Sequence, residues 1–155
     1  MNFALNQDGV TPLMMACQYE AHEIIDLILS NPTTQINMMD IQGANAVHKA
    51  VCYGHLEIMQ KLLRSGGLCI PTIKGATVLH IAVKKGFIEI VKFLLMNREQ
   101  INININARKN NGMTAAMMAA RHNHMYIFHL LQQSGADLFI RLPKSGVDIL
   151  YLAAE

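Results

Sequence analysis

One sequence pattern recurs five times along the 155 residues, and a glycine opens each copy. The opening glycines are Gly9, Gly43, Gly75, Gly112 and Gly146, which lie 34, 32, 37 and 34 residues apart. A period of this length is typical of stacked supersecondary units rather than of one globular core. Each unit in such a stack contacts only its neighbours. We therefore expect binding to occur on a surface and not in a deep pocket.

The composition indicates a folded chain from a reducing compartment. Apolar residues make up 52% of the sequence, which is enough to bury a continuous core. The three cysteines, Cys17, Cys52 and Cys69, fit no closed disulfide framework, and residues 1–9 do not resemble a signal peptide. We expect a cytoplasmic or nuclear location. Charged residues interrupt the most apolar third of the chain, so we expect no membrane insertion.

Charge is unevenly distributed along the sequence. Residues 1–48 contain five acidic residues and no lysine or arginine, whereas all 13 basic residues lie in residues 49–144. Two interpretations stay open, since the asymmetry serves solubility alone or steers a partner of partly acidic character. The net charge of +2 argues against nucleic acid as the partner.

The apolar pattern within each unit predicts two short helices. In the third unit, apolar residues at helical spacing occupy residues 79–83 and 90–95, with a break at Gly86. Threonine is a favoured residue at the position before a helix, where its side chain accepts a backbone hydrogen bond. The candidate N-caps of the first helices are Thr11, Thr77 and Thr114.

Two segments carry a specific family resemblance. Residues 75–95, GATVLHIAVKKGFIEIVKFLL, and residues 43–63, GANAVHKAVCYGHLEIMQKLL, resemble the ankyrin repeat, whose usual pattern is G-x-T-P-L-H-x-A-A-x-x-G-H-x-E-I-V-x-x-L-L. The resemblance covers essentially the whole chain and implies an all-α ankyrin-repeat solenoid of helix-turn-helix repeats with projecting β-hairpin loops. It predicts a single domain, 1–155, with repeats near 6–39, 40–71, 72–108 and 109–142 and a partial fifth at 143–155.

The fourth unit begins after an unusually long connection, residues 96–111. Ile101, Ile103 and Ile105 alternate with asparagines there, a period-two pattern that predicts an extended β-hairpin with an exposed edge. Structural padding and a specific binding loop both remain possible functions of this segment.

The sequence contains no pattern that indicates catalysis. There is no recognisable nucleophile motif and no glycine-rich phosphate loop, and His122, His124 and His129 lack the spacing usual for zinc ligands. The resemblance implies a structural role for His48 and His80, which tie hairpin to helix. We expect no enzymatic activity, no cofactor, no metal and no small-molecule substrate.

The resemblance also implies where a partner binds, because ankyrin contact residues flank the hairpin glycine and end the first helix. Carried over position by position, the candidate partner-binding residues are Tyr19, Ile41, Gln42, Tyr53, Ile73, Lys74, Lys84, Lys85, Asn110, Asn111, Met113, Arg121 and His122. Tyr19 and Tyr53 suit interface anchors, since tyrosine offers a large area at small entropic cost. Packing against a neighbouring hairpin is the alternative for the tyrosines, and a solvated charged face is the alternative for the basic residues.

These observations predict a monomeric, non-enzymatic scaffold for protein–protein interaction. It would bind a protein or peptide partner with some acidic character on a concave groove. Isoleucine and asparagine together make up 29 of 155 residues, a bias typical of AT-rich genomes, including those of intracellular bacteria and protozoa. Many bacterial effectors delivered into host cells resemble short ankyrin arrays, so such an effector is the source we expect. The alternative is a targeting or regulatory ankyrin domain of a larger enzyme continuing beyond residue 155, since the fifth unit stops after its first helix.

Overall fold

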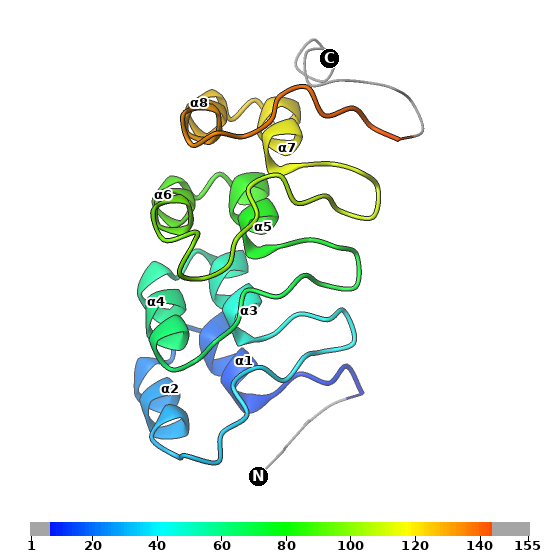
Figure 1. Ribbon diagram of the computed structural model, residues 1–155. Coiled ribbons are helices and arrows are strands. Elements are labelled where there is room, and N and C mark those ends of the chain that lie inside the picture. Colours follow the sequence, from blue (N-terminus) through cyan, green and yellow to red (C-terminus); the bar gives the residue numbers. More distant parts are fainter. Residues whose placement is uncertain (1–6, 144–155) are drawn as a thin grey trace. The chain divides into compact units, whose positions relative to one another are not determined.

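The computed structural model describes residues 7–143, which form four pairs of short helices and contain no β-strand. In chain order the helices are α1 (Pro12–Gln18), α2 (His22–Leu29), α3 (Ala46–Tyr53), α4 (Leu56–Arg64), α5 (Val78–Lys85), α6 (Ile88–Met96), α7 (Ala115–Arg121) and α8 (Met125–Gln133). A tight turn joins the helices of a pair, and a longer projecting loop leads to the next pair (Figure 1). The predicted all-α class is confirmed.

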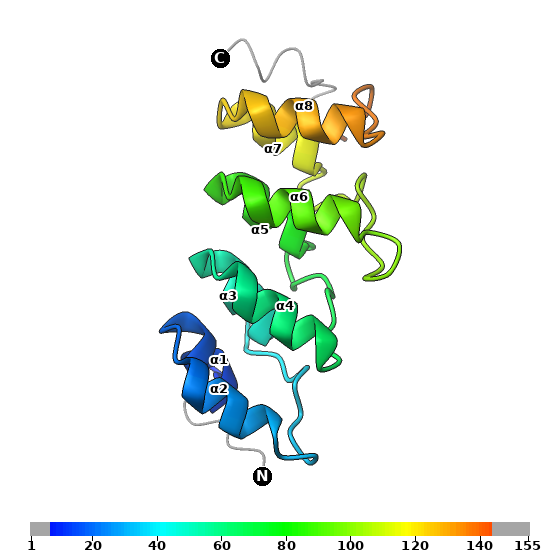
Figure 2. The ribbon, with the colours of Figure 1, turned by 90° about the vertical axis from the view of Figure 1, so that its left-hand side faces the viewer.

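The chain divides into two compact units. Unit 1 is Met1–Ile73 and contains α1–α4, and unit 2 is Lys74–Glu155 and contains α5–α8. In unit 1, α3 packs on both α1 and α4, and in unit 2, α7 packs on both α5 and α8. Figure 2 shows the second helix of each pair lying in front of the first. The first helices thus lie between the second helices and the projecting loops.

Two predictions about the extent of the chain stay open. The single domain spanning 1–155 and its repeat boundaries remain predictions, and the partial fifth repeat at 143–155 lies outside the described residues except for Pro143. Among the helices of residues 7–143, none has the length and apolar character needed to cross a membrane.

Side-chain caps begin each first helix. The hydroxyl oxygens of Thr11, Thr77 and Thr114 accept hydrogen bonds from the backbone N–H three residues onward, over 3.2–3.4 Å. In the second repeat Asn45 takes this role, since its side-chain oxygen accepts from the backbone N–H of His48 at 3.2 Å. The N-terminus of the first helix is therefore capped in all four repeats, including the one that lacks a threonine.

The long connection after α6 is not the predicted extended hairpin. It forms successive turns, in which Ile103 N–H donates to the carbonyl of Arg98 at 2.8 Å and Asn102 has a φ of 55°. Ile103 is buried, so the isoleucine–asparagine alternation places one apolar side chain in the core instead of forming a strand. The Arg98 guanidinium donates to the carbonyl of Ser134 at 2.6 Å. The extra residues therefore lie in the outer loop, where they contact the end of α8.

Candidate binding surfaces

Two exposed tyrosines mark the surface of unit 1. Tyr19 follows α1 and is 69% exposed, and Tyr53 ends α3 and is 47% exposed. They occupy corresponding positions on two helices that pack against each other. Their rings are thus largely accessible, although the ring of Tyr53 stacks on His55 with centroids 6.4 Å apart.

His55, which was not predicted from the sequence, links the turns that follow α1 and α3, next to these tyrosines. His55 Nδ1 lies 3.5 Å from a carboxylate oxygen of Glu20, and its Nε2 lies 3.4 Å from the carbonyl oxygen of Gln18. Glu20 has a φ of 56° at a position where the next repeat has Gly54. These contacts tie the two turns of unit 1 together and so fix the spacing between the tyrosines.

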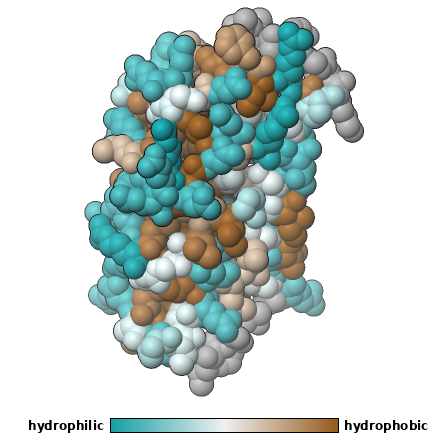
Figure 3. Space-filling view, viewed as in Figure 1, coloured by the Kyte–Doolittle hydropathy of each residue, from teal (hydrophilic) through white to brown (hydrophobic). Residues whose placement is uncertain are grey.

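The hairpin tips of unit 1 form an apolar edge. Ile41 and Ile73 are 55% and 66% exposed, and Figure 3 shows apolar residues at the surface on the side of the projecting loops. Each tip is hydrogen-bonded to the preceding loop, since Ile41 N–H donates to the carbonyl of Asp8 and Ile73 N–H donates to that of Gln42, both at 3.0 Å. The apolar tips are therefore held in place by backbone contacts.

A buried carboxylate organises the hairpin that carries Ile41. The side chain of Asp40 accepts hydrogen bonds from the backbone N–H groups of Gln42 and Ala44, both at 2.9 Å, and from Lys49 Nζ at 2.7 Å. Burial alone would raise the pKa of Asp40, but these hydrogen bonds and the Lys49 charge lower it below its usual value. Asp40 is thus ionised at neutral pH and holds the hairpin to α3.

Removing this carboxylate should destabilise unit 1. We expect Asp40→Ala to cost about 1–3 kcal/mol, because Lys49 and two backbone N–H groups would lose their acceptor. Urea unfolding followed by circular dichroism measures the change. Asp26→Ala is the matched control, since its ion pair with Lys61 joins two more exposed side chains and should contribute under about 1 kcal/mol. Equal losses in the two variants would contradict a special role for Asp40.

Unit 2 carries a hollow of about 260 Å³, which we call the basic hollow. It lies between the ends of α5 and α7 and the hairpin loop that precedes α7. Its lining residues are Lys84, Lys109, Asn111, Met113, Met118, Arg121 and His122. Five of the predicted partner-binding residues thus line the hollow, namely Lys84, Asn111, Met113, Arg121 and His122. Lys74, Lys85 and Asn110 were also predicted, but they are exposed elsewhere on the unit.

Met113 is not the exposed hairpin tip that the sequence predicted. It is 6% exposed, because its side chain lies beneath Arg121, with 3.9 Å between its sulfur and a guanidinium nitrogen. Lys109 and Met118 were missed. Lys109 stands three residues before Gly112, as Asp40 stands three residues before Gly43, and this shared register is the signal that identifies Lys109 as part of the hairpin base.

Of the two buried histidines, His80 ties its helix to the next hairpin, as the resemblance implies, whereas the hydrogen bonds of His48 stay at the start of its own helix. His80 Nδ1 accepts from the backbone N–H of Thr77 at 3.2 Å, and its Nε2 donates to the Met113 carbonyl, also at 3.2 Å. In unit 1, His48 Nδ1 accepts from Asn45 N–H at 3.2 Å, but its Nε2 has no hydrogen-bond partner among the described residues. Burial lowers the pKa of each imidazole to about 4.

Two of the thiols, the buried Cys17 and the partly buried Cys69, are poorly suited to nucleophilic chemistry. Burial raises the pKa of Cys17 to about 12 and that of Cys69 to about 11. Since the thiolate is the reactive form, both side chains are inert at neutral pH.

Comparison with known families agrees with this architecture. A family model described as Ankyrin repeats (3 copies) matches residues 1–72, 34–107 and 67–142. The chain belongs to the ankyrin-repeat family. Members of this family generally act as non-enzymatic modules for protein–protein interaction. No curated protein matches the sequence.

Proposed function

We propose that this protein binds a protein or peptide partner of partly acidic character and has no catalytic activity of its own. Unit 1 offers Tyr19, Tyr53 and the apolar tips, and unit 2 offers the basic hollow. The observation that carries the proposal is the exposure of Tyr19 and Tyr53 at the helix ends where ankyrin repeats contact their partners. Large, rigid side chains of this kind dominate the binding energy of many interfaces.

Charge on unit 2 supports an acidic partner. Lys84, Lys85 and Arg121 are exposed, and no carboxylate within residues 7–143 lies within 4 Å of their charged groups. Complementary charges on a partner would speed association and select against basic competitors. The predicted concave groove, monomeric state and role as a bacterial effector stay predictions, as does a position within a larger enzyme.

We also propose that the protein acts in a reducing compartment, in the cytoplasm or the nucleus. Cys17, Cys52 and Cys69 are all free thiols, which is usual for proteins of those compartments.

Affinity capture from cell lysate tests the binding surface. We expect Tyr19→Ala/Tyr53→Ala to reduce recovery of specific partners at least about tenfold, because truncating an interface anchor costs more than about 1.4 kcal/mol. Lys84→Glu/Lys85→Glu should reduce recovery to a similar extent and should weaken the salt dependence of binding. Quantitative mass spectrometry of the captured proteins measures both effects.

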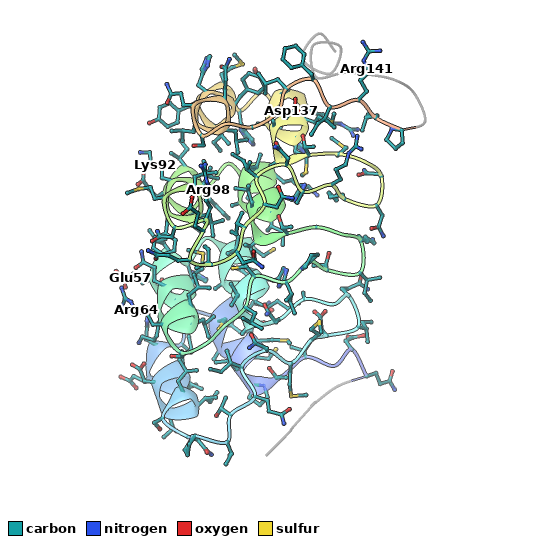
Figure 4. All side chains as sticks on the ribbon, viewed as in Figure 1. Glu57, Arg64, Lys92, Arg98, Asp137 and Arg141 are labelled. Atoms are coloured by element: carbon teal, nitrogen blue, oxygen red, sulfur yellow. The ribbon has the colours of Figure 1, made fainter. Side chains whose placement is uncertain are left out.

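Matched controls use side chains on the opposite side of the helix pairs. Figure 4 shows Arg64 of α4 pointing away from the helices, on the side opposite the projecting hairpin tips, so Arg64→Glu makes a charge reversal away from the candidate surface. Tyr126→Ala removes a tyrosine that is 53% exposed on α8. Circular dichroism checks that each variant folds. If the same partners persist with both double variants, the proposed surface is wrong.

A further inference from the structure

Within residues 7–143, the cations of the basic hollow lack the ion-pair partners that three lysines elsewhere in the chain have. Lys49, Lys61 and Lys92 each lie within 2.6–2.9 Å of a carboxylate oxygen. In contrast, no carboxylate within residues 7–143 forms an ion pair with Lys84, Lys109 or Arg121. Three permanent positive charges therefore surround one small hollow without a carboxylate partner in the part of the chain that the structure describes.

The positive field inside the hollow acts on the histidines beside it. Partial burial lowers the pKa of His122, and the charges of His124, Lys84 and Arg121 lower it further. Lys109 has the same effect on His80, where burial is the larger cause. Positive charges from two adjacent repeats, Lys84 on one and Lys109 and Arg121 on the next, thus act on the histidines beside the hollow.

The uncharged groups of the hollow add hydrogen-bond donors and an apolar floor. Asn111 Oδ1 accepts from the backbone N–H of Met113 at 3.2 Å, which leaves the Asn111 amide nitrogen as a donor toward a ligand. Met113 and Met118 are 6% and 4% exposed and form the floor. Ammonium, guanidinium and amide groups all donate, so the complementary ligand accepts hydrogen bonds and is negatively charged.

The size of the hollow limits the ligand. Its volume of about 260 Å³ is below the range of roughly 300–1,000 Å³ usual for small-molecule sites. It suits a single anionic group at the end of a side chain. One carboxylate brings a single negative charge to three cations, whereas a phosphate monoester brings about −1.5 to −2 and three acceptor oxygens.

We propose that the basic hollow binds a phosphorylated side chain of the partner, held by Lys84, Lys109 and Arg121 with the Asn111 amide as a further donor. This inference rests on the proposed function, because it concerns the chemistry by which the same partner is recognised. Arginine is suited to the role, since its planar guanidinium donates two parallel hydrogen bonds to phosphate oxygens.

Titration with defined probes tests the proposal. The probes are N-acetyl-O-phosphoserine amide, N-acetylglutamate amide and inorganic phosphate, added to the ¹⁵N-labelled protein. We expect phosphoserine amide to shift the resonances of the Asn111 side chain, His122 and the backbone of residues 109–122. It should bind at least about tenfold more tightly than the glutamate derivative, because it carries the larger charge. Inorganic phosphate should compete with it for the same site.

Variants assign the binding to individual residues. Arg121→Gln and Lys109→Gln should each weaken phosphoserine amide binding about tenfold, whereas Arg64→Gln on α4 should leave it unchanged. Lys84→Gln is a second variant on the α5 side, should either of the others fail to fold.

Three outcomes would overturn the proposal. They are equal affinity for the phosphoserine and glutamate probes, shifts spread over exposed lysines such as Lys74 and Lys85, and binding unaffected by Arg121→Gln. Phosphatase treatment of the lysate separates this inference from the proposed function. If captured partners persist after treatment yet still depend on Tyr19 and Lys84, the protein recognises an acidic partner without phosphate.

Discussion

Acidification from pH 7 to pH 4 should destabilise this protein by roughly 3 kcal/mol for each of His48 and His80. Burial lowers both pKa values to about 4, whereas histidine in an unfolded chain has a pKa of about 6.5. Between these values the unfolded chain binds protons that the folded chain does not, so stability falls as the pH falls. The histidine contribution is fully present above about pH 6.5 and is lost as the pH approaches about 4.

Urea unfolding at a series of pH values measures this effect. With both histidines mostly neutral in the folded state, the free energy of unfolding should change by about 2 kcal/mol per pH unit between about pH 4.5 and 6. His80→Gln should lower stability at pH 7, because the bridge from Thr77 to Met113 is lost, and should halve the histidine part of the slope. His129→Gln, on the exposed face of α8, controls for loss of a surface histidine. An unchanged slope in His80→Gln would refute the assignment.

Adding a methyl group at Gly43 should cost roughly 2–4 kcal/mol. Gly43 has a φ of 73°, a conformation that strains any residue with a Cβ. A Cβ there would also lie 2.8 Å from the backbone nitrogen of Ile73, which cannot move without breaking its 3.0 Å hydrogen bond to Gln42. Gly43→Ala therefore combines backbone strain with a clash between two hairpins of unit 1.

A second glycine separates the strain from the clash. Gly66 also has a positive φ, of 93°, but a Cβ there would meet nothing within 4 Å. Gly66→Ala should cost only about 1 kcal/mol, which is the strain alone. Thermal unfolding of both variants measures the difference. If the two substitutions lower the melting temperature equally, the contact between the hairpins does not contribute to stability.

Local patterns were sufficient to predict the helix pairs and their beginnings. Helical spacing of apolar residues indicated both helices of a repeat, and Thr11, Thr77 and Thr114 cap the helices as expected. His80 could likewise be assigned a structural role from its place in the repeat. The caps and the helical packing recur in all four described repeats, so one sequence contains several examples of each.

Features that depend on contacts between distant residues could not be predicted. The connection after α6 is held by hydrogen bonds from Arg98 to Ser134 and from Asp137 N–H to the Asn106 side chain. The alternation of isoleucine and asparagine within the connection gives no sign of these contacts. Met113 occupies a hairpin position that is exposed in a repeat considered alone. It is buried because Arg121 of the following helix covers it. The candidate site was therefore predictable as a set of loop and helix-end positions, but not as a hollow with a floor.

The basic hollow takes Lys84 from one repeat and Lys109, Arg121 and His122 from the next. The hollow is thus formed by two adjacent repeats together, and neither repeat contains all of its charged groups alone. Duplication or exchange of one repeat would create a junction with a new combination of wall residues, without altering either repeat's own sequence. In a chain built in this way, a change in the order of repeats changes the residues that line such a hollow without any point mutation.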